Sequence, residues 1–385
     1  MFPNTFKRAS LLLILFYLPC GAYADAPALE PVFAVPIEVS MPVPPTVFRG
    51  NGQRHMSYEA RVTNWSAIVW TVHRIDVRSD AGVLLQEVEG KALDALLSHP
   101  TRKAADRGEA PGELLPGESM IAYMWIDLGT DTPTPSQLRH RFEVTRAGDS
   151  KQYEIDAPTT LVSNRLPEIT APLRGKNWLA VNGPSNASHH RRARLVLDGA
   201  AHISQRFAID WVQIGENLRT HHGDPKDNRN YLCFGADAIA VGDGVVVEVK
   251  NGIPENIPNQ APVVPITLDT IAGNHINLDL GGGVYAMYAH LQPGSLRVKV
   301  GDSVKRGQVL ALVGNTGNST EPHLHFQLMN GNSPLSSDGL PYALSGFVET
   351  KRITGDLENP TATPLAAPVV HRGEMPLENQ LVDFQ

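Results

Sequence analysis

Short stretches of alternating polar and apolar residues recur along this chain, and they constrain its fold more than any other feature. Residues 57–62, 70–77 and 139–144 each follow this pattern. Successive side chains of a β-strand point to opposite faces, so the alternation predicts strands with one buried face. The 33 Gly and 30 Pro residues mark turns that divide the chain into many such segments. The sequence therefore predicts a mainly β protein.

With 385 residues, the chain is long enough for two domains. Residues 46–165 carry short strands with frequent turns, which predicts an immunoglobulin-like β-sandwich. One helix is expected around residues 91–98. We see no cluster of catalytic residue types in this part of the sequence, so we interpret it as a spacer or docking module. A connecting segment rich in Pro, Gly and Asn follows at residues 166–200.

Strands return in residues 201–350, the second predicted domain. Two long polar or Pro-rich insertions, 215–235 and 251–272, separate these strands, and loops of this length are usually functional or mobile. A Pro-rich tail at residues 351–385 is expected to be poorly ordered. The predicted strands of this domain are residues 205–211, 238–250, 274–280, 284–290, 309–314 and 323–328.

The first 24 residues (1–24) have the features of a secretory signal peptide. Lys7 and Arg8 precede a short apolar run at residues 11–18, and Ala22-Tyr23-Ala24 offers a small-x-small cleavage site. The apolar run is much shorter than the ~20 residues that span a bilayer. We therefore expect cleavage after Ala24, export to the periplasm or the extracellular space, and no stable membrane insertion afterwards. Residues 25–45 then form a linker rich in Pro and Ala.

The net charge and the cysteine content indicate whether the chain is expected to bind nucleic acid and whether it can form a disulfide. The net charge is −7 and the sequence pI is about 6.1, so nucleic acid is not an expected ligand. Signal cleavage removes Cys20 and leaves Cys233, so no intramolecular disulfide can form. A lone thiol in an exported protein is usually buried and inert.

The residues that could carry chemistry gather in the second domain. His323 and His325 are two apart in a predicted strand, so both imidazoles face the same side of the sheet. His290 ends another alternating strand, and Asp210 lies at the end of a third. One carboxylate with several imidazoles is a chemically sensible set of ligands for Zn²⁺ that leaves a position open for water.

In this order, these residues resemble the lysostaphin-type family of zinc metallopeptidases. The resemblance covers about residues 201–345 and implies an antiparallel β domain, similar to the duplicated hybrid motif, with the metal in a groove. The stretches that carry it are Arg206-Phe207-Ala208-Ile209-Asp210, residues 240–246, Asn274-His275-Ile276, Tyr288-Ala289-His290-Leu291, residues 300–308, and Gly314 through His325.

The resemblance also implies roles for single residues. His325, the second histidine of the His-x-His pair, and Asp210 would be zinc ligands. His323 and His290 would be the catalytic residues that face the attacking water and the oxyanion. The implied activity is a zinc-dependent metalloendopeptidase that acts on the peptide cross-links of bacterial cell-wall peptidoglycan.

One departure from the family pattern puts this activity in question. Where the family has its first zinc-binding histidine, four residues before Asp210, this chain has Arg206, and a guanidinium has no lone pair for a metal. We expect His190, in the connecting segment, to supply the third ligand. If no histidine does, the metal is held by only two protein side chains, or the domain is a non-catalytic relative that binds peptidoglycan or regulates another cell-wall hydrolase. The other candidates for this position are His189, His202, His221 and His222.

Overall fold

The computed structural model describes residues 35–103, 110–355 and 359–385. The predicted signal peptide and most of the predicted linker lie outside these residues. The end of the linker is described, and there Ile37–Ser40 forms strand β1, which pairs with β3 and has Ile37 and Val39 buried. Among the described residues, no helix is long and apolar enough to cross a bilayer.

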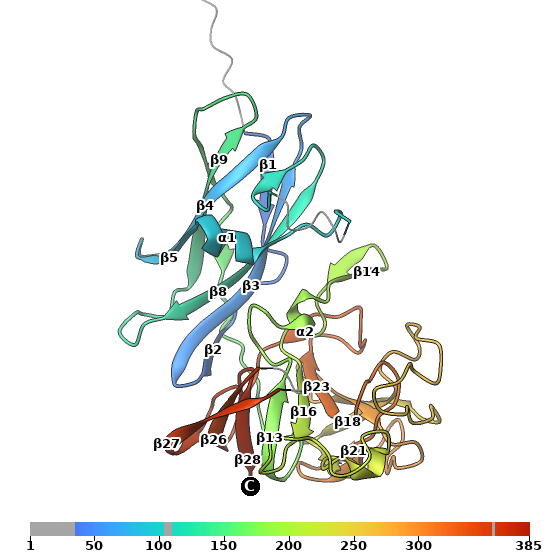
Figure 1. Ribbon diagram of the computed structural model, residues 1–385. Helices are drawn as coiled ribbons and strands as arrows, with labels where there is room; N and C mark the ends of the chain where they lie inside the picture. The colour runs from blue at the N-terminus through green and yellow to red at the C-terminus, as the bar shows by residue number, and fades with distance from the viewer. Residues whose placement is uncertain (1–34, 104–109, 356–358) are drawn as a thin grey trace, which may run out of the picture. The chain divides into compact units, whose positions relative to one another are not determined.

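The N-terminal part contains two antiparallel sheets (Figure 1). The first sheet has the order β1, β3 (Gln53–Asn64), β8 (Ser119–Leu128) and β6 (Leu97–Ser98), with β2 (Val47–Gly50) paired to β3. The second has the order β10 (Tyr153–Asp156), β9 (Gln137–Arg146), β4 (Trp70–Ser79) and β5 (Leu84–Glu89), with β11 (Thr160–Leu161) and β7 (Glu113–Leu114) at its margins.

Alternating burial confirms the strands predicted here. Along β9 the residues Leu138, His140, Phe142 and Val144 are buried, while Arg139 and Arg141 between them are exposed. The buried faces of the two sheets meet, since the Tyr58 hydroxyl on β3 lies 2.7 Å from Nε2 of His140 on β9. The predicted helix is also present, as α1 (Gly90–Leu96).

The C-terminal part of the described chain is built on an 11-stranded antiparallel sheet. Its order is β21 (Ser303–Val304), β18 (Gly244–Lys250), β19 (Asn274–Asp279), β20 (Tyr285–Leu291), β23 (Leu324–Met329), β16 (Ile209–Gln213), β13 (Gly175–Val181), β28 (Gln380–Phe384), β26 (Phe347–Thr354) and β27 (Thr361–His371), with β24 (Gly339–Leu340) on β23. Small two-stranded sheets pair β12 (Glu168–Ile169) with β25 (Ala343–Leu344), β14 (Leu195–Leu197) with β15 (Ala200–His202), and β17 (Asp237–Ile239) with β22 (Val309–Leu312).

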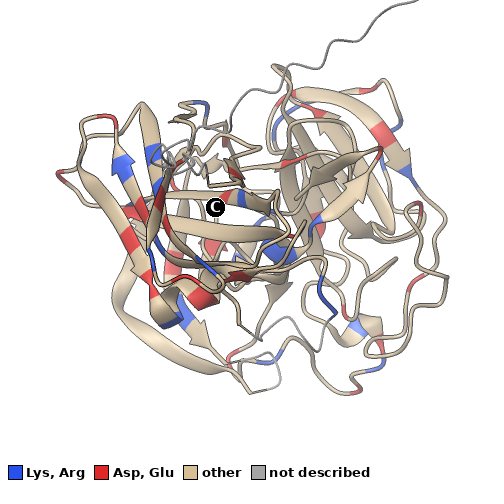
Figure 2. Cartoon of the chain, turned by 90° about the horizontal axis from the view of Figure 1, so that it is seen from above, with Lys and Arg blue, Asp and Glu red and all other residues tan. Residues whose placement is uncertain are grey.

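Large apolar side chains fill the core beneath this sheet. Trp211 and Tyr288 are fully buried, and the Tyr288 ring meets that of Phe326 edge-on at 5.2 Å. Cys233 is also buried, as expected for a lone thiol, and burial raises its pKa to about 12. Charged groups stay mostly outside the core, and Figure 2 shows acidic and basic residues interspersed along the strands and loops.

The structure corrects the prediction of a poorly ordered tail. Residues 361–371 and 380–384 form β27 and β28, and β28 lies between β13 and β26 inside the sheet. The alternating sequence pattern of β28 was hard to recognise because the strand has only five residues. Pro364 and Pro368 obscured β27, but proline is tolerated in an edge strand, where one row of backbone donors is unpaired.

The connecting segment, residues 166–200, also differs from a simple linker. It contributes β13 to the middle of the sheet and a short helix, α2 (His189–Arg192). The first predicted strand of the C-terminal part begins later than expected, because residues 204–207 form a turn and β16 starts only at Ile209. The predicted insertions 215–235 and 251–272 contain no strand, and η2 (Asn228–Asn230) is a short 3₁₀ helix in the first of them.

Candidate metal centre

Two neighbouring strands bring the carboxylate and one imidazole together. β16 and β23 pair so that Asp210 lies directly opposite His325. Side chains of directly opposed residues project from the same face of a sheet with their Cβ atoms about 5 Å apart. The next strand, β20, places Ala289 opposite His325, so His290 follows at the edge of the same cluster. The sequence predicted this convergence of Asp210, His290, His323 and His325.

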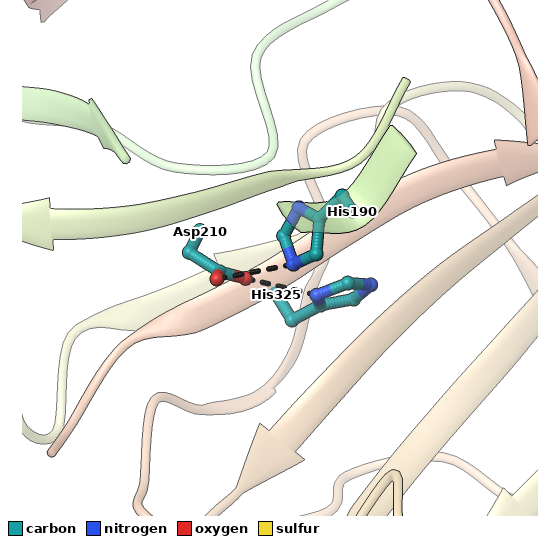
Figure 3. Close-up of side chains that lie close together, drawn as sticks. All are labelled: His190, Asp210 and His325. Carbon is teal, nitrogen blue, oxygen red and sulfur yellow. Dashed lines mark hydrogen bonds and ion pairs between the residues drawn. The ribbon is translucent and has the colours of Figure 1, made fainter. Parts of the chain in front are cut away.

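A third group reaches the cluster from helix α2. His190 points toward Asp210, and Figure 3 shows the imidazoles of His190 and His325 converging on the Asp210 carboxylate. Nε2 of His190 lies 3.2 Å from Asp210 Oδ2, and Nδ1 of His325 lies 2.9 Å from Asp210 Oδ1. One ligand atom from each of the three residues lies within 4.8 Å of the other two, and all three side chains are buried.

The outer nitrogens of both imidazoles are anchored, which fixes the ring orientation. Nδ1 of His190 lies 3.0 Å from the Asn182 carbonyl oxygen, and Nε2 of His325 lies 2.8 Å from Gln327 Oε1. Because these oxygens accept hydrogen bonds, the outer nitrogen of each ring carries the proton and the inner nitrogen keeps its lone pair in the neutral form. This is the usual arrangement of metal-binding histidines.

Electrostatics also fit a cation at this place. Burial alone would raise the pKa of Asp210, but the neighbouring His190 and His323 hold it well below its usual value. Burial lowers the pKa of His190, and the Asp210 carboxylate outweighs that effect, so the pKa is raised. The carboxylate therefore remains ionised in a buried position and attracts positive charge. Two imidazole nitrogens and a carboxylate are the donor set of a catalytic Zn²⁺ site, so the residues present fit this metal.

Two more histidines border the cluster. Nε2 of His323 lies 3.4 Å from Asp210 Oδ1, and the His290 ring centre lies 4.7 Å from that of His323. Burial lowers the pKa of His323, and Asp210 outweighs this effect and raises it. Burial and the adjacent imidazoles hold the pKa of His290 well below its usual value.

The backbone holds both of these rings by Nδ1. The Nδ1 of His323 lies 2.8 Å from the Glu321 carbonyl oxygen, and that of His290 lies 2.7 Å from the Thr316 carbonyl oxygen. His290 itself has a φ of 62°, a left-handed conformation that non-glycine residues rarely adopt and that recurs at functional sites. Gly317 lets the Thr316 turn pack this closely, because a Cβ there would lie 2.3 Å from the Gly273 nitrogen.

The other candidate histidines lie elsewhere. Nδ1 of His202 lies 3.3 Å from Asp338 Oδ2, the His221 ring packs against Tyr231, and His222 is exposed. His189 lines a hollow of about 870 Å³ together with His221. Arg206 also points away from the cluster. It is buried and donates hydrogen bonds to Glu59 and Asp338.

Sequence reasoning missed the residues that support the ligands. Asn182 donates from Nδ2 to Asp210 Oδ2 at 2.9 Å while its own carbonyl accepts from His190. No motif marks this residue. Gln327 had a usable signal, since it lies two residues beyond His325 on the same face of β23.

Two hollows lie beside the cluster. The one lined by His189 and His221 also contains Asn182 and Glu321, and its walls are polar and apolar in about equal measure. The other, of about 210 Å³, has mainly apolar walls that include Met287 and Leu335, with His290 and His325 at its margin. These lining residues, unlike the ligands, come mostly from loops.

The comparisons with known proteins identify the domain that holds this cluster. The model of peptidase family M23 matches residues 232–337, which include His290, His323 and His325. The C-terminal half of the chain carries an M23 domain. The match begins after Asp210 and His190, so the contribution of these two residues rests on the geometry described above.

Curated relatives extend the likeness. The chain is 33% identical over 227 residues to the peptidoglycan DD-endopeptidase ShyA of Vibrio cholerae, a match that covers 55% of this chain and 47% of that protein. It is 43% identical over 76 residues to lysostaphin of Staphylococcus simulans, covering 19% of this chain and 15% of that protein. The chain thus spans less than half the length of these relatives.

A solved structure of the catalytic domain of lysostaphin from Staphylococcus simulans aligns with 43% of this chain and 88% of its own, at 25% identity. The TM-score of this alignment is 0.25.

Proposed function

We propose that this protein is a zinc-dependent metalloendopeptidase that cleaves peptide cross-links of bacterial cell-wall peptidoglycan. The observation that carries the proposal is the buried group of His190, Asp210 and His325, with two further histidines beside it. The M23 domain and the likeness to a relative named as a peptidoglycan DD-endopeptidase support the substrate class.

His190, Asp210 and His325 would hold the zinc ion. When bound, zinc supplies a Lewis acid for the scissile carbonyl and lowers the pKa of a coordinated water to about 7. His190 takes the place that Arg206 leaves without a ligand. The three protein ligands leave a position open for water, which is the pattern of catalytic zinc sites.

His323 would serve as the general base. Its Nδ1 is anchored on the Glu321 carbonyl, so Nε2 is the nitrogen that faces the cluster and takes the proton from the attacking water. His290 would stabilise the oxyanion from its own Nε2, which is likewise the free nitrogen. That role requires a protonated ring, and the negative oxyanion is the charge that raises the low pKa of His290 at that moment.

The surrounding parts of the chain have proposed roles as well. We propose that the N-terminal sheets form an immunoglobulin-like sandwich and that the signal-like start directs export to the periplasm or the extracellular space. Export would place the enzyme in the compartment of its substrate.

The test is digestion of purified peptidoglycan sacculi by the full-length protein, with the released fragments identified by mass spectrometry and the metal content measured in parallel. We expect about one zinc per chain and conversion of cross-linked fragments into monomers. His325→Ala should abolish both. Stoichiometric zinc without any loss of cross-links would reject the peptidase and favour the non-catalytic relative.

A further inference from the structure

The segment that carries His190 is held by the N-terminal sheet rather than by the M23 domain alone. Arg191, the next residue, is completely buried and donates to the carbonyl oxygens of Tyr58 on β3 and Met124 on β8, at 2.9 and 2.7 Å. Arg192 stacks its guanidinium 4.1 Å above the ring centre of Tyr123. The short helix α2 is therefore docked on two neighbouring strands of the first N-terminal sheet, β3 and β8.

Glu59, on β3, joins this helix to the turn that precedes the strand of Asp210. Its Oε1 accepts from Nε of Arg191 at 3.2 Å, and its Oε2 accepts from Nε of Arg206 at 2.8 Å. Arg191 is adjacent to His190, and Arg206 lies four residues before Asp210. One carboxylate thus ties together the two chain segments that bring His190 and Asp210 to the metal centre.

The charges of this network balance inside the protein. Arg191 and Arg206 face the carboxylates of Glu59 and Asp338, and all four residues are at most 9% exposed. A buried charge that loses its partner is strongly unfavourable, so the structure rearranges to rehydrate it. Removal of the Glu59 charge leaves two guanidinium groups against one carboxylate, and rearrangement would move the segments that hold the ligands.

We infer that Glu59 is a positioning residue for the metal centre, through which the N-terminal domain completes a site that the M23 domain does not hold by itself. The inference rests on the proposed zinc function. It also gives Arg206 a role, because the arginine that stands where the family has a histidine ties the turn before β16 to Glu59 of the N-terminal domain. The segment that contains Arg191, which also bonds Glu59, carries His190, the replacement ligand.

The test compares two glutamate variants of the full-length protein. Glu59→Gln removes the charge with little change of shape. Glu118→Gln is the matched control, because Glu118 is also a buried N-terminal glutamate, 6% exposed, that bonds an arginine, Arg102, away from this network. Zinc affinity is measured by competition with a chelator, thermal stability in the metal-free state, and the ligand set by the visible absorption of the Co²⁺-substituted protein.

We expect Glu59→Gln to lower zinc affinity by roughly 10- to 100-fold, the range found for residues that orient metal ligands, and to change the Co²⁺ spectrum. Glu118→Gln should lower thermal stability and leave zinc affinity and spectrum as in the wild type. Equal zinc affinity in Glu59→Gln and wild type, or an equal loss in both variants, would overturn the inference.

Two further measurements keep the result decisive. If Glu59→Gln does not fold, Arg191→Lys tests the same contact. Lysine keeps the charge but lacks the planar guanidinium that reaches Glu59 and both carbonyl oxygens at once. Unchanged zinc affinity in Arg191→Lys also refutes the inference. The wild-type protein separates the two proposals. Wild type that binds no zinc contradicts the proposed function, whereas zinc-binding wild type with unaffected variants contradicts only the role of Glu59.

Discussion

Substitution of Asn182, which hydrogen-bonds the proposed ligands Asp210 and His190, tests how residues behind the ligands affect zinc affinity. Asn182→Gly removes the amide that donates to Asp210 at 2.9 Å but retains the carbonyl that accepts from His190. The backbone is not disturbed, because Asn182 has a φ of 50° and glycine adopts this conformation without strain. The variant therefore isolates one hydrogen bond to a buried carboxylate.

The size of the effect follows from the charge of the acceptor. A hydrogen bond to a charged group contributes about 1.5–3 kcal/mol. At 1.4 kcal/mol for each factor of ten, loss of this bond should weaken zinc binding by roughly 10- to 100-fold. Zinc affinity is measured by chelator competition at fixed pH, and thermal unfolding of the metal-free protein reports the separate effect on the fold.

Asn177→Gly is the matched control. Asn177 lies on β13 with a φ of 62°, and its side chain is exposed. Both variants carry the flexibility of an added glycine, which costs about 0.5–1 kcal/mol of stability. Only Asn182→Gly should lose zinc affinity. A wild-type affinity in Asn182→Gly, or the same loss in both variants, would refute the claim that the amide orients Asp210.

Three further predictions concern catalysis, pH and export. His323→Ala should retain zinc and lose roughly 10²- to 10⁴-fold in peptidoglycan hydrolysis, as for removal of a general base; loss of the metal as well would instead make His323 a ligand. The hydrogen bond to Glu349 raises the pKa of buried His371. Its stabilisation is thus complete below the unfolded-state pKa of about 6.5 and declines as pH rises through the higher folded-state value. The urea midpoint of wild type should therefore exceed that of His371→Gln most at low pH, and a gap that widens from pH 6 to 9 would contradict this. N-terminal sequencing of the exported protein should begin near Asp25, and an intact Met1 start in the cytoplasm would argue against a signal peptide.

Local pattern was sufficient where a residue's environment depends on its immediate neighbours in the sequence. The alternation at residues 139–144 gave β9, and the spacing of His323 and His325 placed both on one side of a strand. The position of His190 near Asp210 also followed from sequence, but only because a ligand was missing at Arg206 and few histidines were available to replace it.

Pattern failed where the deciding contacts are distant in the sequence. β13 and β28 pair with each other although about two hundred residues separate them, and each also pairs with a second strand, β16 or β26. Glu59 is one of many acidic residues in the sequence, and nothing near it indicates that Arg191 and Arg206 share its carboxylate. Such long-range pairings leave no local periodicity, so no inspection of a single segment could have found them.

The place of β28 in the sheet has a consequence for the order of synthesis and assembly. β13 pairs on one side with β16, which carries Asp210, and on the other with β28, some two hundred residues later in the chain. Non-local pairings of this kind form slowly, because a long loop must close, at a cost in entropy, before the strands make any stabilising contact. Until residues 380–384 have been synthesised, one edge of β13 stays open. The sheet around the metal centre is therefore completed only when the chain is nearly whole.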